Sequence, residues 1–245
     1  MNILAFDTAY SGCTVALQFN QRIASRFEDT TSQQTHYILP LIEELLAEVG
    51  ASIADLDFIA YGRGPGRFTG VRIANALAQG LAYAHHKPLI PISSLAVLAQ
   101  SAAIKHGWPC IVTAVDARMG QIYLACFEVN HTGMVELRGQ EEVYNLKENQ
   151  KLHDQLGSTM LANRQVVKNF TDLSITSAVG TTSFWGVGDG WLIKDPNLVS
   201  LMTSPPIEIA ANMTTSPEGL LLLAERQWRQ EGGVAAHQAF PNYLR

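Results

Sequence analysis

Residues 62–73 read Gly-Arg-Gly-Pro-Gly-Arg-Phe-Thr-Gly-Val-Arg-Ile, a glycine-dense turn that runs directly into an apolar segment. The pattern predicts a buried strand before this turn, over Leu56–Tyr61, and a helix after it, over Val71–Ala84. A strand, a glycine turn and a helix start in this order can bind an anion, because the first N–H groups of a helix have no partner within it. The same order is also found in a tight turn that needs glycine for its conformation alone, since Gly64, Gly66 and Gly70 can take positive φ and carry no Cβ.

Two common nucleotide-binding patterns do not fit this turn. A Walker loop needs Gly-Lys followed by Ser or Thr, and no lysine lies between Gly62 and Gly80. The dinucleotide pattern fails as well, because Thr69 stands at the third glycine position and Gly70 comes one residue late. A Walker ATPase is therefore not expected.

Length and composition indicate a compact globular protein. The 245 residues are enough for one large domain or for two lobes that each bury a core. Apolar residues make up 47% of the chain and charged residues 16%, with a net charge of −5. No extended basic face is expected, so the chain is not expected to hold nucleic acid unaided.

Cysteine usage and the N-terminus indicate a soluble cytoplasmic protein. Cys13, Cys110 and Cys126 lie in apolar runs without CxxC spacing, which predicts buried, reduced thiols. Because Asp7 comes so early and no apolar run approaches membrane-spanning length, neither a signal peptide nor a membrane segment is expected.

Further strands and helices follow from periodicity and capping residues. Strands are expected over Asn2–Phe6, Cys13–Phe19, Arg22–Phe27 and Pro88–Ile92. Helices are expected over Gln34–Val49, with Gly50 as its stop and Pro40 as a kink or first turn, from Ser93 or Ser94 to His106, and from the cap Ser216 to Gly232.

The helix after the glycine turn is apolar almost all round, which predicts burial on several sides. Ala76, Gly80 and Ala84 recur every four residues and place small side chains on one face. Packing within the chain is the simpler explanation of this stripe, and a subunit interface is the alternative.

The chain repeats one pattern in outline. An apolar strand that ends on Asp7, a turn, and a second strand are echoed by Ile111–Asp116, a turn, and Gln121–Phe127. Two lobes of one design are therefore expected. Between residues 145 and 215 only a weakly helical stretch, Leu152–Phe170, and a glycine turn, Gly186–Gly190, can be recognised.

The sequence offers binding residues without an evident nucleophile or base. No two of the seven histidines are spaced three or four apart, and no Gly-x-Ser-x-Gly elbow occurs. Asp7 and Asp116 are the carboxylates placed as in a phosphate or magnesium site, and capping of their turns is an equal alternative. No catalytic residue and no metal ligand is predicted.

Five motifs together resemble the TsaB (YeaZ) family. They are Ile3-Leu-Ala-Phe-Asp7-Thr8, Thr35-His-Tyr-Ile-Leu-Pro40, the Gly62–Ile73 turn, Asp116-Ala-Arg-Met-Gly120 and Tyr243-Leu-Arg245, with Gly186–Trp191 adding a little. The resemblance runs from end to end and implies a two-lobed α/β fold of the actin, sugar-kinase and Hsp70 type. It implies an N-terminal lobe over 1–107, a C-terminal lobe over 108–215, and a C-terminal helix and tail over 216–245 that pack back on the first lobe.

The resemblance implies an accessory role in synthesis of threonylcarbamoyladenosine beside the tRNA anticodon. Members bind the catalytic subunit TsaD, support its activity and help to recruit the ATPase TsaE. TsaD holds its metal with a His-x-x-x-His helix, and this sequence has none. The resemblance implies that the chain needs no cofactor, that ATP and Mg²⁺ serve the assembled complex, that tRNA is met only through the complex, and that the chain alone can form a homodimer.

The resemblance places the interface with TsaD on the two helices near His36–Val49 and Val71–Ala84. The expected contact residues are His36, Leu39, Ile42 and Leu46 on the first helix, and Arg72, Ala76, Gln79, Gly80 and Tyr83 on the second. The expected anion- or nucleotide-binding residues are Asp7, Thr8, Gly64, Gly66, Thr69 and Asp116. The alternatives are a nucleotide-dependent phosphotransferase or ATPase of the same fold and, more remotely, a metallopeptidase.

Overall fold

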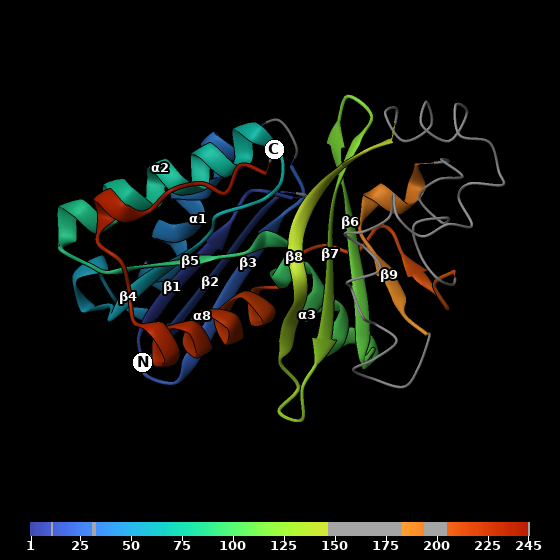
Figure 1. Ribbon diagram of the computed structural model, residues 1–245. Coiled ribbons are helices and arrows are strands. Elements are labelled where there is room, and N and C mark those ends of the chain that lie inside the picture. Colours follow the sequence, from blue (N-terminus) through green and yellow to red (C-terminus); the bar gives the residue numbers. More distant parts are fainter. Residues whose placement is uncertain (11, 31–32, 147–182, 194–204, 245) are drawn as a thin grey trace, which may run out of the picture. The chain divides into compact units, whose positions relative to one another are not determined.

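The computed structural model describes residues 1–10, 12–30, 33–146, 183–193 and 205–244, and it folds as two compact units (Figure 1). The first unit comprises Met1–Ser101 and Thr214–Tyr243, and the second lies between Ala102 and Met213. The sequence placed the divisions after residues 107 and 215, whereas the contacts place them after Ser101 and Met213. No helix within the described ranges is both long and apolar enough to span a membrane.

The first unit contains a five-stranded mixed sheet in the order β3-β2-β1-β4-β5. Its strands are β1 Ile3–Asp7, β2 Cys13–Phe19, β3 Arg22–Glu28, β4 Phe58–Gly62 and β5 Leu89–Ile92. β2 pairs antiparallel with β1 and β3, while β4 pairs parallel with β1 and β5. All residues of β1 and β4 are buried, as expected for strands covered on both faces.

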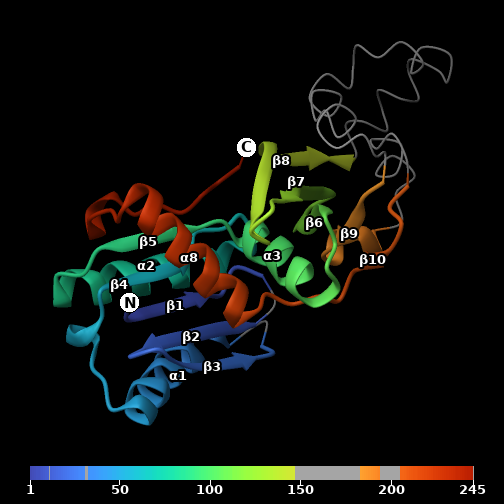
Figure 2. The ribbon, with the colours of Figure 1, turned by 90° about the horizontal axis from the view of Figure 1, so that it is seen from below.

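Helices cover both faces of this sheet. α1 Gln34–Val49 and α2 Phe68–His85 lie on one face, and α8 Pro217–Glu231 lies on the other, in front of the sheet in Figure 2. α3 Ser94–His106 carries the chain from the first unit into the second. Short 3-10 helices, Ile53–Asp55 and Ala236–Gln238, complete the unit.

Side chains from alternate strand positions form the core on each face. Leu4, Phe6 and Ile59 face α1 and α2 and are fully buried against them. On the other face, the ring of Phe58 stacks on Trp228 of α8 at 4.7 Å between centroids. Aromatic burial of this kind contributes on the order of 1 kcal/mol beyond the area removed from water.

The second unit repeats the first. Its strands are β6 Cys110–Arg118, β7 Gln121–Val129, β8 Val135–Asn145, β9 Trp185–Val187 and β10 Ile209–Ala210, with a 3-10 helix over Asp189–Leu192. The order β8-β7-β6-β9-β10 and the antiparallel or parallel sense of every pair match the first sheet. The predicted duplicated α/β fold is therefore confirmed, and Cys110 and Cys126 are buried, as is Cys13 in the first unit.

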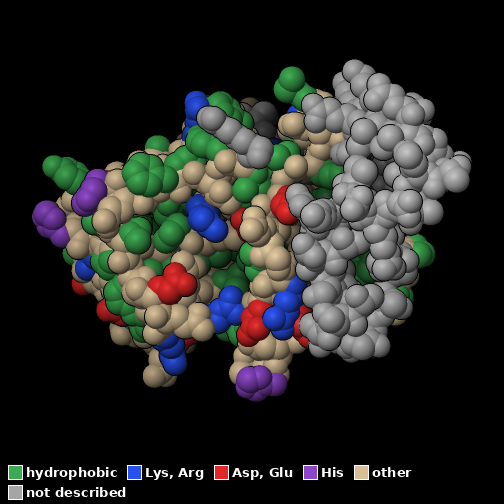
Figure 3. Space-filling view, in the orientation of Figure 1, with side chains coloured by type: hydrophobic (Ala, Val, Ile, Leu, Met, Phe, Trp, Pro, Cys, Tyr) green, Lys and Arg blue, Asp and Glu red, His purple; other side chains and the backbone are tan. Residues whose placement is uncertain are grey.

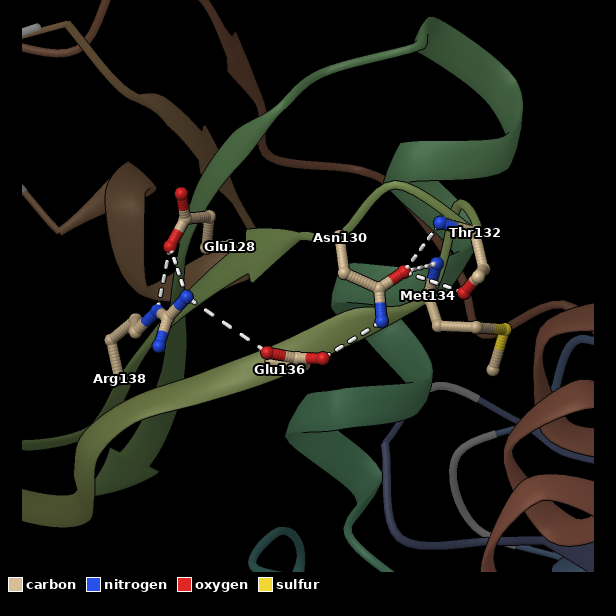
Figure 4. Close-up of polar contacts among 6 residues, drawn as sticks. All are labelled: Glu128, Asn130, Thr132, Met134, Glu136 and Arg138. Carbon is tan, nitrogen blue, oxygen red and sulfur yellow. Dashed lines mark hydrogen bonds and ion pairs between the residues drawn. The ribbon is translucent and has the colours of Figure 1, made fainter. Parts of the chain in front are cut away.

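The hairpin of β7 and β8 is held by a polar network (Figure 4). Asn130 Oδ1 accepts hydrogen bonds from the N–H groups of Thr132 and Met134, and its Nδ2 donates to Glu136 at 2.8 Å. Glu128 and Glu136 lie directly opposite each other, which would be repulsive, but Arg138 forms ion pairs with both. The network thus fixes the turn of this hairpin.

Several predicted bounds are confirmed, and others shift. Cys13–Phe19 and Gln34–Val49 have the predicted ends, with Pro40 inside α1, and Ser216 Oγ caps α8 by accepting from the N–H of Gly219 at 3.0 Å. α2 begins three residues before the predicted Val71. The predicted turn Gly186–Gly190 contains the end of β9 and the start of a 3-10 helix, and the stretch Leu152–Phe170 lies outside the described residues.

Candidate functional site

The glycine turn between β4 and α2 is built around one left-handed residue. Gly64 has φ of +85°, the conformation that favours glycine, and a Cβ there would lie 2.9 Å from Val71. Gly66 and Gly70 do not have positive φ, so of these three glycines only Gly64 uses that freedom. They are glycines for a different reason, because a Cβ at Gly66 would overlap the carbonyl oxygen of Ala9 and one at Gly70 that of Thr8.

The turn after β1 fills the space that the glycines leave. The N–H of Arg67 donates to the carbonyl oxygen of Ala9 at 2.7 Å, and the Thr8 hydroxyl donates to the carbonyl oxygen of Gly70 at 2.6 Å. The side chain of Gln34 in α1 donates to the Thr8 carbonyl at 3.2 Å. The backbone that approaches the glycine turn is therefore the chain's own, and the structural explanation accounts for Gly66 and Gly70.

Asp7 is a buried carboxyl beside this turn. Its Oδ1 accepts the N–H of Ala9 at 2.7 Å, while its Oδ2 has no hydrogen-bond partner among the described residues. A Cβ at Gly62 would overlap the carboxylate. Burial raises the pKa of Asp7 to about 6, against the opposing effects of Ala9 N–H and the hydroxyl of Ser94.

Asp116 in the second unit is the counterpart of Asp7 in the repeat. Its Oδ1 accepts the N–H of Arg118, two residues on, as Asp7 accepts that of Ala9. Its carboxylate pairs with the Arg118 guanidinium at 3.0 Å, and its own N–H donates to Asp189 Oδ1 at 2.9 Å. Both aspartates thus cap their turns, whereas an anion-binding role for the residues predicted here stays a prediction.

The pKa of Asp7 predicts how stability depends on pH. The folded chain binds this proton more tightly than the unfolded chain, whose aspartate has the usual pKa of 3.8. The stability due to protonation is thus fully present below about pH 4 and is lost as the pH rises through about 6. Between pH 4 and pH 7 we expect the unfolding free energy of the wild type to fall by about 2–3 kcal/mol relative to Asp7→Asn. Urea unfolding of both proteins at pH 4, 5, 6 and 7 measures this difference, and parallel pH profiles would contradict it.

On α1, the predicted interface residues differ in exposure. His36 is exposed, Leu39 is 44% exposed and Leu46 is half-buried. Ile42 is buried in the core that α1 forms with the sheet, together with Ile38. Ile42 is only 2% exposed within this unit, whereas the contact of the α1 residues with a partner stays a prediction.

On α2, the small residues form an exposed stripe. Ala76, Gly80 and Ala84 are exposed, and a Cβ added at Gly80 would meet no atom within 4 Å. A second set of small residues packs on the sheet, namely Ala74, Ala78 and Ala82. The simpler explanation from the sequence was that the stripe Ala76, Gly80 and Ala84 packs within the chain. Among the described residues this explanation is wrong, because the stripe is exposed. Tyr83, which is 80% exposed, extends the same outer face.

Gln79 and Asn75 hold the segment that follows α8 against α2. Gln79 Nε2 donates to the carbonyl oxygens of Ala236 and Ala239, and Asn75 Nδ2 donates to Ala239 as well. The N–H of Asn242 donates to the carbonyl oxygen of Arg63 at 2.8 Å. Gln79 is thus half-buried under this segment, which runs along α2 in Figure 1.

An open groove of about 500 Å³ lies between α1 and α2. Its lining is mostly apolar and consists of Thr35, Ile38, Leu39, Phe68, Thr69, Arg72, Ile73, Ala76 and Leu77. Phe68 is 59% exposed, and Phe240 and Tyr243 of the C-terminal segment are also exposed large side chains. In Figure 3, hydrophobic side chains gather on the surface formed by α2 and this segment.

Sequence analysis missed the aromatic residues of this surface. Phe68 was assigned to the turn, and Tyr243 was noted only as part of a motif. Exposed large side chains of this kind are common at protein interfaces. The groove, the small-residue stripe and the aromatic residues together form the surface that we call the α1–α2 surface.

The duplicated sheets define the class of protein to which the chain belongs. A family model described as "TsaD: tRNA N6-adenosine threonylcarbamoyltransferase" matches residues 27–240, which places the chain in that class of duplicated α/β proteins.

A solved structure described as an uncharacterized protein with similarity to peptidase YEAZ from Pseudomonas aeruginosa matches with a TM-score of 0.80 at 34% identity, covering 100% of this chain and 99% of that one. YeaZ from Pseudomonas aeruginosa matches with a TM-score of 0.79 at 33% identity, covering 99% of each chain. The "tRNA threonylcarbamoyladenosine biosynthesis protein TsaB" of Escherichia coli K12 is 42% identical over 134 residues, which are 55% of this chain and 58% of that relative. The match therefore spans little more than half the length of this curated relative. These similarities show that, within this class, the chain belongs to the TsaB (YeaZ) family.

Proposed function

We propose that the chain is a non-catalytic accessory subunit in the synthesis of threonylcarbamoyladenosine on tRNA. In this proposal it binds a TsaD-type catalytic subunit through the α1–α2 surface and supports the activity of that subunit. The name of the Escherichia coli relative and the family match to TsaD support the pathway. Kinship with TsaD also supports pairing, because two proteins of one fold can join through related surfaces.

The observation that carries the proposal is the exposed small-residue stripe beside an apolar groove. Ala76 and Gly80 allow the backbone of a partner helix to approach α2, and Leu39 and Leu77 offer apolar area next to them. Each 100 Å² of apolar surface buried contributes roughly 2.5 kcal/mol before the costs of association. A typical stable interface buries about 800 Å² per partner.

The polar residues of the turn after β1 support a non-catalytic role. Thr8 is hydrogen-bonded to Gly70 of α2 and to Gln34 of α1, and the Asp7 carboxylate accepts the N–H of Ala9 in its own turn. In this proposal the ATPase TsaE joins the assembled complex, ATP and Mg²⁺ serve that complex, and tRNA is met through it in the cytoplasm. Without TsaD, the α1–α2 surface supports a homodimer.

Mixing the purified chain with its cognate TsaD tests the proposal. We expect a complex that elutes as one peak from a sizing column at micromolar concentration, because the surface is preformed and apolar. Two separate peaks at the same concentration would contradict the proposal.

The alternative function is that of a nucleotide-dependent phosphotransferase, which the buried Asp7 beside a glycine turn favours. The proposed accessory role predicts no detectable heat when ATP and Mg²⁺ are added to the isolated chain in a calorimeter, because Thr8 and Ala9 occupy the glycine turn. Tight binding with turnover that Asp7→Asn abolishes would favour the alternative instead. Asp55→Asn, at an exposed carboxylate, is the control.

A further inference from the structure

Arg72 is held in a fixed position at the edge of the α1–α2 groove. Its guanidinium carbon lies 3.7 Å from the centroid of the Phe68 ring and 6.0 Å from that of Tyr243. Its Nε donates to the Tyr243 hydroxyl at 3.1 Å, and the two rings lie 6.1 Å apart. A stacked, hydrogen-bonded guanidinium loses less conformational freedom on binding than a free side chain does.

The two terminal nitrogens of Arg72 have no carboxylate partner among the residues that the structure describes. Its hydrogen bond to Tyr243 uses Nε alone, and no acidic residue occurs anywhere in α2. Arg72 is exposed and is one of the residues that line the groove. A planar pair of donors held in this way matches the two oxygens of a carboxylate.

The rest of the groove indicates what carries that carboxylate. Ile38, Leu39 and Leu77 present apolar side chains, and Ala76 presents a small one, which fits an apolar helix lying along α2. A cation at the edge of such a groove favours one acidic residue on that helix. A helix with a basic residue at the same place would be rejected by like charge.

We propose that Arg72, fixed by Phe68 and Tyr243, is a specificity-determining residue that receives a carboxylate from an otherwise apolar helix of the catalytic partner. This inference rests on the proposed function, since the partner is the TsaD-type subunit. Phe68 and Tyr243 are positioning residues in it, because they act through Arg72.

Calorimetric titration of cognate TsaD into variants of the full chain tests this inference. We expect Arg72→Met, which keeps an apolar stem, to weaken the Kd by about 10-fold to 100-fold. Arg72→Lys should also weaken the Kd about 10-fold, since lysine keeps the charge but lacks the planar pair of N–H donors. Tyr243→Phe, which removes one hydroxyl and keeps the ring, should weaken it only a few-fold. Arg22→Met is the matched control, because Arg22 is an exposed arginine at the start of β3.

The salt dependence of the Kd separates recognition of a carboxylate from simple packing. The wild type should bind more weakly as salt rises from 50 to 500 mM, and Arg72→Met should lose most of that dependence. A Kd for Arg72→Met within two-fold of Arg22→Met, or an unchanged salt dependence, would overturn the inference while leaving the proposed function in place. If Arg72→Met loses only self-association and still binds TsaD as the wild type does, the inference is overturned as well. If the wild type itself fails to bind TsaD, both the proposed function and this inference fall.

Discussion

Gly80→Leu is expected to weaken binding of the catalytic partner by about 100-fold or more while leaving the fold intact. A leucine at this position would stand in the exposed small-residue stripe and keep a partner helix from approaching α2. The fold should tolerate it, because no atom lies within 4 Å of the position of a Cβ there. Replacing glycine in a helix also raises the free energy of unfolding, by up to about 1 kcal/mol.

Calorimetry with TsaD and urea unfolding measure these two effects separately. The control is Gln230→Leu, which adds the same side chain at an exposed position of α8, on the other face of the sheet. It should bind TsaD as the wild type does. Equal affinities of the two variants would place the interface elsewhere.

Gly70→Ala is expected to lower the free energy of unfolding by about 3 kcal/mol or to prevent folding. A Cβ there would overlap the carbonyl oxygen of Thr8 and lie 2.8 Å from its carbonyl carbon. These are backbone atoms in the turn that follows β1, and the side chain of Gln34 hydrogen-bonds to that same oxygen. The clash cannot be relieved by rotating a side chain.

Gly80→Ala is the matched control for this effect, since it makes the same chemical change in the same helix where space is open. It should be neutral or stabilising by up to about 1 kcal/mol. Urea unfolding of the two variants is the measurement. Similar midpoints would show that the turn after β1 can move away from α2, and the explanation given for Gly70 would be wrong.

Features set by short-range chemistry could be predicted from the sequence. Ser216 caps α8 and Gly50 ends α1 in the left-handed conformation, because both depend on a few neighbouring residues. The duplicated hairpins could be recognised because each apolar strand carries, at its end in β1 and two residues before it in β6, an aspartate that caps its own turn.

Features set by distant contacts could not be predicted. Gly66 and Gly70 are required by the approach of Thr8 and Ala9, which are far away in sequence. The contact of Arg72 with Tyr243 joins residues 171 positions apart. A sequence shows that glycine or arginine is present, but not which segment lies against it.

The outward face of α2 was ambiguous for a related reason. Ala74, Ala78 and Ala82 are as small as the stripe Ala76, Gly80 and Ala84, so composition does not show which stripe packs on β4. β8 was missed because several of its residues are polar and exposed, which weakens the alternation that identifies a strand.

A tRNA modification assay with the threonylcarbamoyl adenylate as donor tests the central claim most directly. TsaD and TsaE are assayed with tRNA in the presence and absence of this chain, and the chain is assayed alone. The proposed accessory role predicts modified tRNA only when the chain and TsaD are both present, and none from the chain alone. Modification by the isolated chain, or full activity of TsaD and TsaE without it, would contradict the proposal.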